Sequence, residues 1–412
     1  MPELFGRDGQ LWIGCMANQE GGWMEEELKI RQLLQVMVEK DASDLYLMAG
    51  APPGYRINGV IRRLGEAEVS PIIIERLADK LMSEKQKADF ALEMEMNLSA
   101  AISGLGRFRV NVYRQRGTVG MVIRQITTDI PTLDGLNLPD MFKDVAMSKR
   151  GLVLMVGATG SGKSTSLAAM VDWRNSNQAG HIITIEDPVE FMHPHKKCYV
   201  TQREVGSDTI SFRNALKNTL RQAPDVILLG EIRDREVMEH AISFAETGHL
   251  AMATLHANNA NQALDRILNF FPEEQHQQVY MNLSMNLRAI LSQRLVKTVD
   301  GKRAAAIEIM VNTPRIADLV LKGDVGAIKE AMEAGEQHGM RTFDQALFQL
   351  WQDGKISEIE ALRNADSANN LRLKMKMATI EGASEGEASA SADDILQHRS
   401  DDDKGGGLKL TI

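Results

Sequence analysis

Apolar positions recur at helical spacing near the start of the chain. Ile30, Leu33, Leu34 and Met37 would lie on one face of a helix, and the glutamates of the preceding turn suit the positive end of the helix dipole. Residues 1–23 contain five glycines and show no sustained period. We therefore expect a flexible extension over 1–23 and a folded chain from about residue 24.

After this helix the pattern changes to short strands separated by turn residues. In the segment RFRVNVY, Phe108, Val110 and Val112 alternate with polar residues, so one face of this strand should be buried. The segment after Pro71 is expected to be helical. Together these elements predict a small α+β domain over 24–126. The expected strands are 44–48, 55–64, 107–117 and 118–126.

The segment 127–140 combines proline, glycine and helix-capping residues with little periodicity, which is typical of a linker. Continuous apolar runs then alternate with helical stretches as far as about residue 310, which indicates a mostly parallel sheet covered by helices on both faces. Small helices should follow over 314–371. We expect this second domain to span 141–375, and the small, acidic residues of 376–412 to form a disordered tail. The apolar runs are 152–156, 181–187, 225–231 and 249–256.

Composition narrows the class of protein. A length of 412 residues favours two folded domains, and 43% apolar with 25% charged residues is typical of a globular chain. No apolar run approaches the ~18 to 20 residues that span a bilayer, and the start lacks a secretory signal, so we expect a soluble cytoplasmic protein. The net charge of -9 disfavours a nucleic-acid partner. Cys15 and Cys198 are too few for a disulfide framework or a four-cysteine zinc site.

The segment 157–165 reads GATGSGKST and satisfies the pattern G-x-x-x-x-G-K-[ST] between an apolar run and a helical stretch. Lys163 would bridge the β- and γ-phosphates of ATP, and Ser164 would ligate Mg²⁺. The alternative is a glycine-rich structural turn, which the strand and helix on either side disfavour. The expected nucleotide-binding residues are Gly157, Ala158, Thr159, Gly160, Ser161, Gly162, Lys163, Ser164 and Thr165.

Hydrolysis also requires carboxylates at the ends of neighbouring strands. Glu231 ends the apolar run 225–231, which has the form of a Walker B strand, and is a candidate to orient Mg²⁺ and its water shell. A second segment, ITIEDPVEF, places Glu186, Asp187 and Glu190 after another apolar run, where one of them could polarise the attacking water. Each carboxylate alone could be a solvated loop residue or a helix cap. Their clustering near a phosphate loop favours a catalytic role.

Histidine and arginine residues supply further candidates. His249 and His256 flank the last apolar run and could sense the γ-phosphate, since no third ligand suggests a metal site. Arg109, Arg116 and Arg124 lie on or between the expected strands of the first domain and could stabilise negative charge on phosphate oxygens. Ordinary surface ion pairs are an equal alternative for each arginine.

Five segments together resemble the PilT/PilU group of secretion-superfamily ATPases, which power retraction of type IV pili. The resemblance covers about 24–375 and implies an α/β fold: a RecA-like P-loop ATPase domain with a smaller α+β (PAS-like) N-terminal domain. The segments are 42–61, 157–165, 185–191, 220–234 and 245–260.

The resemblance also implies roles. In that group Glu190 of the Asp box (about 183–191) would be the general base, and Glu231 the Walker B glutamate. His249 and His256 occupy His-box positions (about 248–257). Members form hexameric rings with ATP between the small domain and the P-loop domain, and arginines of the small domain reach the phosphates. Arg109, Arg116 and Arg124 are the candidates for that contact.

Two departures point to one branch of the group. PilT-type motors carry an AIRNLIRE-like signature after the TP turn, whereas this chain reads TPRIADLVLKGDVGAIKEAM from Thr313. The segment 362–376 and the acidic tail are similar to the accessory PilU branch, which is usually paired with PilT. The four-cysteine module of zinc-binding extension and secretion ATPases is missing from the sequence.

We therefore expect a homohexameric, Mg²⁺-dependent ATPase that is peripheral at the inner-membrane pilus base. It would act in pilus retraction and twitching motility as an accessory motor, with a PilT-like motor and the platform protein as partners. Two alternatives stay open. One is a ring-shaped translocase on nucleic acid, which the acidic balance disfavours; the other is an ATP-gated adaptor that couples another motor to the platform.

Overall fold

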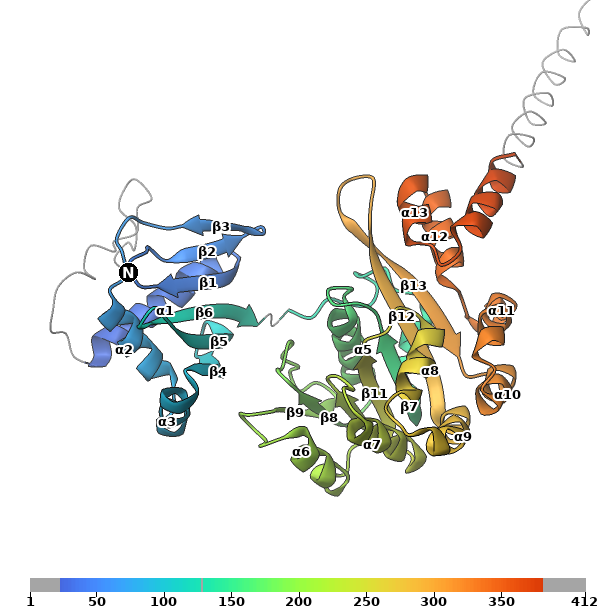
Figure 1. Ribbon diagram of the computed structural model, residues 1–412, viewed down its shortest axis with the longest axis horizontal. Coiled ribbons are helices and arrows are strands. Elements are labelled where there is room, and N and C mark those ends of the chain that lie inside the picture. Colours follow the sequence, from blue (N-terminus) through green and yellow to red (C-terminus); the bar gives the residue numbers. More distant parts are fainter. Residues whose placement is uncertain (1–22, 127–128, 381–412) are drawn as a thin grey trace, which may run out of the picture. The chain divides into compact units, whose positions relative to one another are not determined.

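The computed structural model describes residues 23–126 and 129–380 (Figure 1). No helix in these ranges is long and apolar enough to cross a membrane. The described residues form two compact units. Of the described residues, one unit contains those up to Gly135 with Phe142–Arg150 and Ser164–Ala253, and the other contains Leu136–Met141, Gly151–Lys163 and those from Thr254 to 380.

An antiparallel sheet of six strands lies in the N-terminal part of the chain, in the order β3-β2-β1-β6-β5-β4. Three helices accompany it: α1 (Trp23–Glu39), α2 (Pro71–Leu81) and α3 (Glu84–Glu93). The strands are β1 (Ala42–Met48), β2 (Gly54–Ile57), β3 (Val60–Arg63), β4 (Glu95–Ile102), β5 (Gly106–Gln115) and β6 (Thr118–Ile126). The helix expected around Ile30–Met37 and the strands expected at 44–48, 107–117 and 118–126 are thus confirmed. The single strand expected at 55–64 is wrong: Asn58 and Gly59, with φ 49° and 80°, form a turn that divides it into the antiparallel strands β2 and β3.

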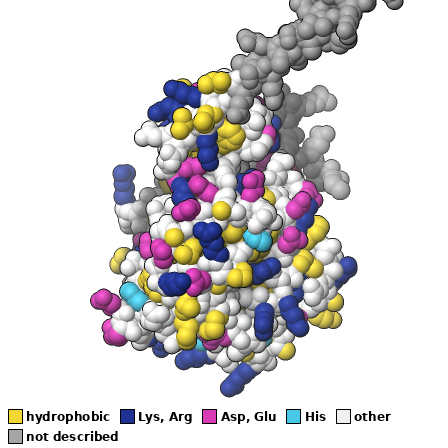
Figure 2. Space-filling model, turned by 90° about the vertical axis from the view of Figure 1, so that its right-hand side faces the viewer, with side chains coloured by type: hydrophobic (Ala, Val, Ile, Leu, Met, Phe, Trp, Pro, Cys, Tyr) yellow, Lys and Arg dark blue, Asp and Glu magenta, His cyan; other side chains and the backbone are white. Residues whose placement is uncertain are grey.

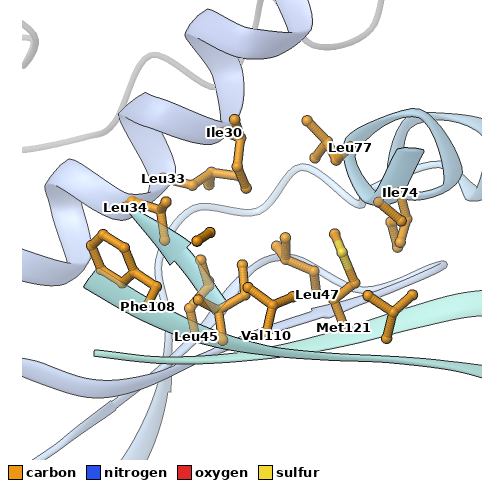
Figure 3. Packing of buried hydrophobic residues seen from close by; sticks show 14 of the residues in the cluster. Ile30, Leu33, Leu34, Leu45, Leu47, Ile74, Leu77, Phe108, Val110 and Met121 are labelled. Carbon is orange, nitrogen blue, oxygen red and sulfur yellow. The ribbon is translucent and has the colours of Figure 1, made fainter. Parts of the chain in front are cut away.

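The core of this part lies between α1, α2 and one face of the sheet (Figure 3). Phe108 and Val110 of β5 are fully buried, as the alternation of β5 predicts. Arg109, between them, is exposed. Ile30, Leu33 and Leu34 of α1 and Ile74 and Leu77 of α2 pack over Leu45, Leu47 and Met121 of the strands.

The helical segment expected after Pro71 is interrupted. Met82 has extended backbone angles, and Ser83 begins a second helix through a capping box in which Gln86 and Ser83 each satisfy the other's backbone N–H. This local competition ends α2 at Leu81, because a serine that caps a new helix start cannot continue the preceding one.

A sheet of seven strands has the order β13-β12-β7-β11-β10-β8-β9. Its pairs β8–β9, β8–β10, β10–β11 and β7–β12 are parallel and β12–β13 is antiparallel, so the predicted mostly parallel sheet is confirmed. Every residue of β7, β10 and β11 is buried. The strands are β7 (Gly151–Val156), β8 (Gly180–Glu186), β9 (Cys198–Glu204), β10 (Val226–Leu229), β11 (Leu250–Leu255), β12 (Leu287–Lys297) and β13 (Arg303–Val311).

Helices alternate with these strands and continue after them. The earlier ones are α4 (Met141–Ala146), α5 (Lys163–Asn177), α6 (Phe212–Thr219), α7 (Arg235–Glu246), α8 (Ala260–Leu268) and α9 (His276–Asn286). The small helices expected after residue 314 are α10 (Pro314–Lys322), α11 (Ile328–Glu333), α12 (Phe343–Gln352) and α13 (Glu358–Asn364).

A final helix covers 368–380, so the first residues of the predicted disordered tail are helical. The helix persists there because Leu371 and Met375 are buried in a cluster with Phe343 and Leu347 of α12. The rest of the predicted tail, the extension before Trp23 and residues 127–128 of the predicted linker lie outside the described residues.

Candidate active site

The phosphate loop begins where the buried strand β7 ends and closes at the first turn of α5. A Cβ at Gly157 would lie 2.5 Å from the carbonyl oxygen of Gln293 and would also collide with Ser161 Oγ. Gly162 has φ 87°, and a Cβ there would lie 2.7 Å from Gln293 Nε2. These close approaches require glycine at both positions, so the loop is packed against β12 through its backbone.

Lys163 directs its cation into the loop. Its Nζ donates to the carbonyl oxygens of Gly157 (2.7 Å) and Ala158 (3.0 Å), and the residue is only 8% exposed. Ser161 Oγ is buried without a hydrogen-bond partner among the described residues. A buried hydroxyl and a buried ammonium group beside a glycine loop are donors suited to phosphate oxygens, so the loop fits a nucleotide.

Two cavities adjoin this loop. The larger, of 480 Å³, is lined by 157–159, His256, Ala257, Asn258, three residues of α8 and Asn269, which caps the end of that helix. The smaller, of 320 Å³, is lined by 158–161, Asn258, 293–295, Arg303 and Asn364. We call these the His256 cavity and the Arg294 cavity. Volumes of ~300 to 1,000 Å³ are usual for small-molecule sites.

The two His-box histidines do not occupy one site. His249 precedes β11 and His256 follows it, so they are roughly 23 Å apart along the strand at about 3.3 Å per residue. His249 Nδ1 lies 3.1 Å from Thr247 Oγ1 and 3.2 Å from the carbonyl oxygen of Phe244, beside the end of α7. Of the pair, His256 lines the cavity at the loop, and His249 lies at the other end of β11.

Two of the expected carboxylates share an arginine. Arg233 Nε lies 2.8 Å from Glu231 Oε2, and Arg233 Nη1 lies 3.4 Å from Asp187 Oδ2. Glu231 follows β10 and Asp187 follows β8, which are adjacent parallel strands. Arg233 thus connects the two carboxylates that follow these adjacent strands.

Glu186 lies at the end of β8 and is half-buried. Burial raises the pKa of Glu186, although hydrogen bonds from Thr184, Gln202 and the backbone of Glu190 oppose that rise. Thr184 Oγ1 donates to Glu186 Oε1 at 2.6 Å, and Gln202 Nε2 donates to it at 3.3 Å. Glu190 is exposed on the same loop. The Glu186 side chain is thus fixed by hydrogen bonds, whereas the Glu190 side chain is accessible to water.

The three candidate arginines lie on the exposed face of the six-stranded sheet or at its rim. Arg109 of β5 is paired directly opposite Arg124 of β6. Arg124 Nε lies 2.7 Å from Asp44 Oδ1, so Arg124 takes part in an ion pair. Arg116 occupies the turn between the two strands, with φ 48°, roughly 23 Å from Arg109 along the strand. The three cannot contact one phosphate group together.

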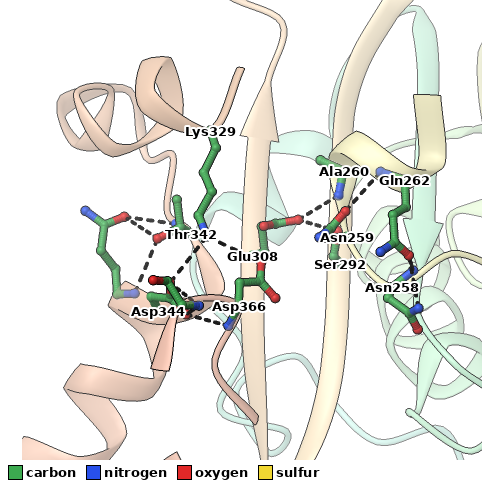
Figure 4. Close-up of polar contacts among 12 residues, drawn as sticks. Asn258, Asn259, Ala260, Gln262, Ser292, Glu308, Lys329, Thr342, Asp344 and Asp366 are labelled. Atoms are coloured by element: carbon green, nitrogen blue, oxygen red, sulfur yellow. Dashed lines mark hydrogen bonds and ion pairs between the residues drawn. The ribbon is translucent and has the colours of Figure 1, made fainter. Parts of the chain in front are cut away.

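Glu308 is a buried acid that the sequence patterns did not single out. It lies in β13, and its Oε1 accepts hydrogen bonds from the N–H of Ala260 (2.7 Å) and from Ser292 Oγ (2.9 Å) (Figure 4). Ala260 begins α8, directly after the wall of the His256 cavity. Burial raises the pKa of Glu308 to about 7; the two hydrogen bonds and Arg294 lower it, and Asp366 adds to the rise. The acid therefore anchors the start of α8.

Replacing Glu308 by glutamine is expected to flatten the pH dependence of stability. A carboxyl whose pKa is about 7 in the folded chain and about 4.5 in the unfolded chain binds more protons when folded, so it lowers stability as pH rises through that window. The native chain should lose roughly 2 to 3 kcal/mol from this group between pH 5 and pH 8. Urea unfolding of both proteins at a series of pH values measures the difference; parallel curves would contradict the assignment.

The carboxylates, the phosphate loop and the fold define the class of protein. The family model described as Type II/IV secretion system protein matches residues 20–363. The chain belongs to this family. Within the Type II/IV secretion family, the Type IV pilus ATPase PilU of Pseudomonas aeruginosa is 55% identical over 353 residues, which cover 85% of this chain and 92% of that protein. The predicted membership of the PilT/PilU group is thereby confirmed.

Two further secretion-family proteins agree. The Type IV pilus retractation ATPase PilT of the same organism is 42% identical over 343 residues, covering 83% of this chain and 100% of PilT. The crystal structure of the pilus retraction motor PilT with bound ADP matches with a TM-score of 0.79 at 39% identity, covering 83% of this chain and 98% of that chain. The predicted fold class, a RecA-like ATPase domain with a smaller N-terminal α+β domain, is confirmed.

Proposed function

We propose that this chain hydrolyses ATP as a motor of type IV pilus retraction and twitching motility. The observation that carries the proposal is the phosphate loop: a buried Lys163 and a Ser161 hydroxyl that has no partner within 23–126 and 129–380, beside a cavity of 480 Å³. The 55% identity to a pilus ATPase supports the proposal that this motor acts on a pilus.

Each residue of the candidate site has its own role in ATP hydrolysis. Backbone N–H groups of 157–165 and the Lys163 ammonium bind the phosphate oxygens and stabilise the charge that grows as the bond to the β-phosphate breaks. Glu190 takes a proton from the water that attacks the γ-phosphorus. Mg²⁺, held through Ser164 and through water on Glu231, would neutralise the phosphates. Arg233 holds Glu231 and Asp187 in place.

The proposal includes an assembly. The chain forms a homohexameric ring, in which each interface is heterologous and the sixfold rotation closes. In this ring, phosphates bound by another subunit are contacted by Arg109, Arg116 and Arg124. Because Arg116 lies far from the other two arginines, it contacts a different phosphate group from theirs. The ring acts at the cytoplasmic side of the inner membrane as an accessory to a PilT-like motor and works on the platform protein.

A nucleic-acid translocase is the less favoured alternative. On the face shown in Figure 2, basic and acidic side chains of the described residues are interspersed and do not separate into a basic stripe. Such a stripe is the usual footprint of a protein that binds phosphate backbones. An ATP-gated adaptor would bind nucleotide at the same loop without productive turnover.

Pilus retraction in living cells tests the proposed accessory role. Retraction events of labelled pili would be counted in cells with and without the PilT-like motor, each carrying this chain intact or as Lys163→Ala. We expect retraction with both proteins present, fewer events with the Lys163 variant, and almost none when the PilT-like motor is missing. Frequent retraction by this chain alone would refute the accessory role, and equal retraction with the variant would refute the motor.

A further inference from the structure

The guanidinium of Arg294, on β12, joins three separate segments of the chain. Nη1 donates to the carbonyl oxygen of Asn364 at 2.6 Å. Nη2 donates to the carbonyl oxygen of Asn258 at 3.2 Å and lies 2.7 Å from Asp366 Oδ1. The Arg294 Cζ atom lies 3.8 Å from the ring centroid of Phe343. Four contacts by one planar cation are specific to arginine, because an ammonium group lacks the fork and the stacking surface.

One end of this connection is the wall of the nucleotide site. Asn258 and Asn364 line the Arg294 cavity together with 158–161 of the phosphate loop. Asn258 also lines the His256 cavity. Its N–H and its side-chain amide both donate to Gln262 of α8, and Asn259 caps that helix. Through the carbonyl oxygen of Asn258, Arg294 therefore contacts the backbone segment that leads from His256 into α8.

The other end of the connection is the group of C-terminal helices. Asp344 of α12, which is 6% exposed, accepts hydrogen bonds from the N–H groups of Asp366 (2.8 Å) and Ser367. Lys329 of α11 lies 3.3 Å from Asp344 Oδ2 and 3.7 Å from Asp366 Oδ2 (Figure 4). Asp366, whose carboxylate pairs with Arg294, is thus connected through Lys329 and Asp344 to α11 and α12, just before the last helix begins.

We propose that Arg294 is a positioning residue that couples nucleotide occupancy at the phosphate loop to the C-terminal helices through Asn258 and Asp366. When the segment 256–258 adjusts to a nucleotide bound at the phosphate loop, the carbonyl oxygen of Asn258 moves relative to Arg294, and the paired Asp366 transmits the change to α11–α13. A partly buried charge pair with several hydrogen bonds favours one arrangement over intermediate ones. The inference rests on the proposed nucleotide site.

The test uses the full chain and three variants. Asp366→Asn keeps the shape of the side chain and removes its charge, and Arg294→Lys keeps the charge and removes the fork. Lys322→Gln breaks an exposed ion pair with Asp318 on α10 and serves as the matched control. Hydrogen–deuterium exchange of peptides covering 343–375 would be measured with and without saturating ADP, together with the affinity for ADP and the kcat and KM for ATP.

In the native chain and in Lys322→Gln, ADP should slow exchange in these peptides by about fivefold or more. In Asp366→Asn and Arg294→Lys that response should disappear and kcat should fall about tenfold, while the affinity for ADP and the KM change less than about threefold. A merely structural role would speed exchange equally with and without ADP.

The outcomes separate this proposal from the nucleotide site itself. A response to ADP that persists in both network variants, or ADP binding by the native chain without any response over 343–375, would overturn the coupling alone. Failure of the native chain to bind ADP would overturn the nucleotide site and the coupling with it.

Discussion

Replacement of Lys163 by alanine is expected to lower ATP turnover by about a hundredfold to a thousandfold. Removing one donor aimed at the charge of a transition state has an effect of this size, and the Lys163 ammonium is buried in the loop that would hold the phosphates. Phosphate release by the purified full chain measures the loss. Lys149→Ala, at an exposed lysine just before β7, should keep native turnover.

A folding defect must be separated from a catalytic one, because Lys163 also bonds to the carbonyl oxygens of Gly157 and Ala158. A second variant, Lys163→Arg, keeps a cation at the loop but cannot place a compact ammonium group between these carbonyls. We expect it to be inactive with a thermal unfolding midpoint close to native. Turnover above half the native rate in Lys163→Ala would contradict a catalytic role for the loop.

Replacement of Glu190 by glutamine is expected to lower kcat by about 10²- to 10⁴-fold, the range that general-base catalysis supplies. Nucleotide affinity should stay within about threefold of native, because the amide keeps the size of the side chain and the phosphate loop is untouched. Phosphate release and binding of a fluorescent ADP analogue measure the two quantities.

Glu186→Gln is the comparison that assigns the base. Glu186 is held by Thr184 and Gln202 at the end of β8, so its loss should reduce kcat less than the loss of Glu190. If Glu186→Gln abolished turnover and Glu190→Gln did not, the base would be Glu186, whose pKa burial already raises.

The parts of the fold that could be predicted have strong local signals. In β7, β10 and β11 every residue is buried and nearly all are apolar, and β5 alternates between core and solvent. The loop 157–165 is a local motif with a fixed spacing. These elements need no knowledge of distant contacts, because their own periodicity or glycine positions determine them.

The strands that the sequence did not predict depend on distant partners. β12 carries Gln293 and Arg294 in its middle, and Arg294 is hydrogen-bonded to segments 36 to 72 residues away along the chain. β4 has only two buried residues and pairs along β5. Weak alternation of this kind cannot be separated from loop without the partner strand.

In the candidate site, too, local signals could be predicted from the sequence, and contacts between distant segments could not. His249 and His256 look equivalent in sequence, and the length of β11 separates them. Glu308 is a single acid in the apolar segment AAAIEIMV, a signal for a buried carboxylate that could have been noticed. Arg233 follows Glu231 by two residues, but its contact with Asp187 of another loop depends on the pairing of β8 with β10.

Retraction under load tests most directly whether ATP hydrolysis by this chain moves a pilus. The speed of single pili pulling against an optical trap would be recorded in cells that keep the PilT-like motor and carry this chain either intact or as Glu190→Gln. We expect the variant to slow retraction increasingly as the load rises, while the purified variant still binds nucleotide. Equal speeds at every load, with turnover lost in the purified variant, would contradict the account.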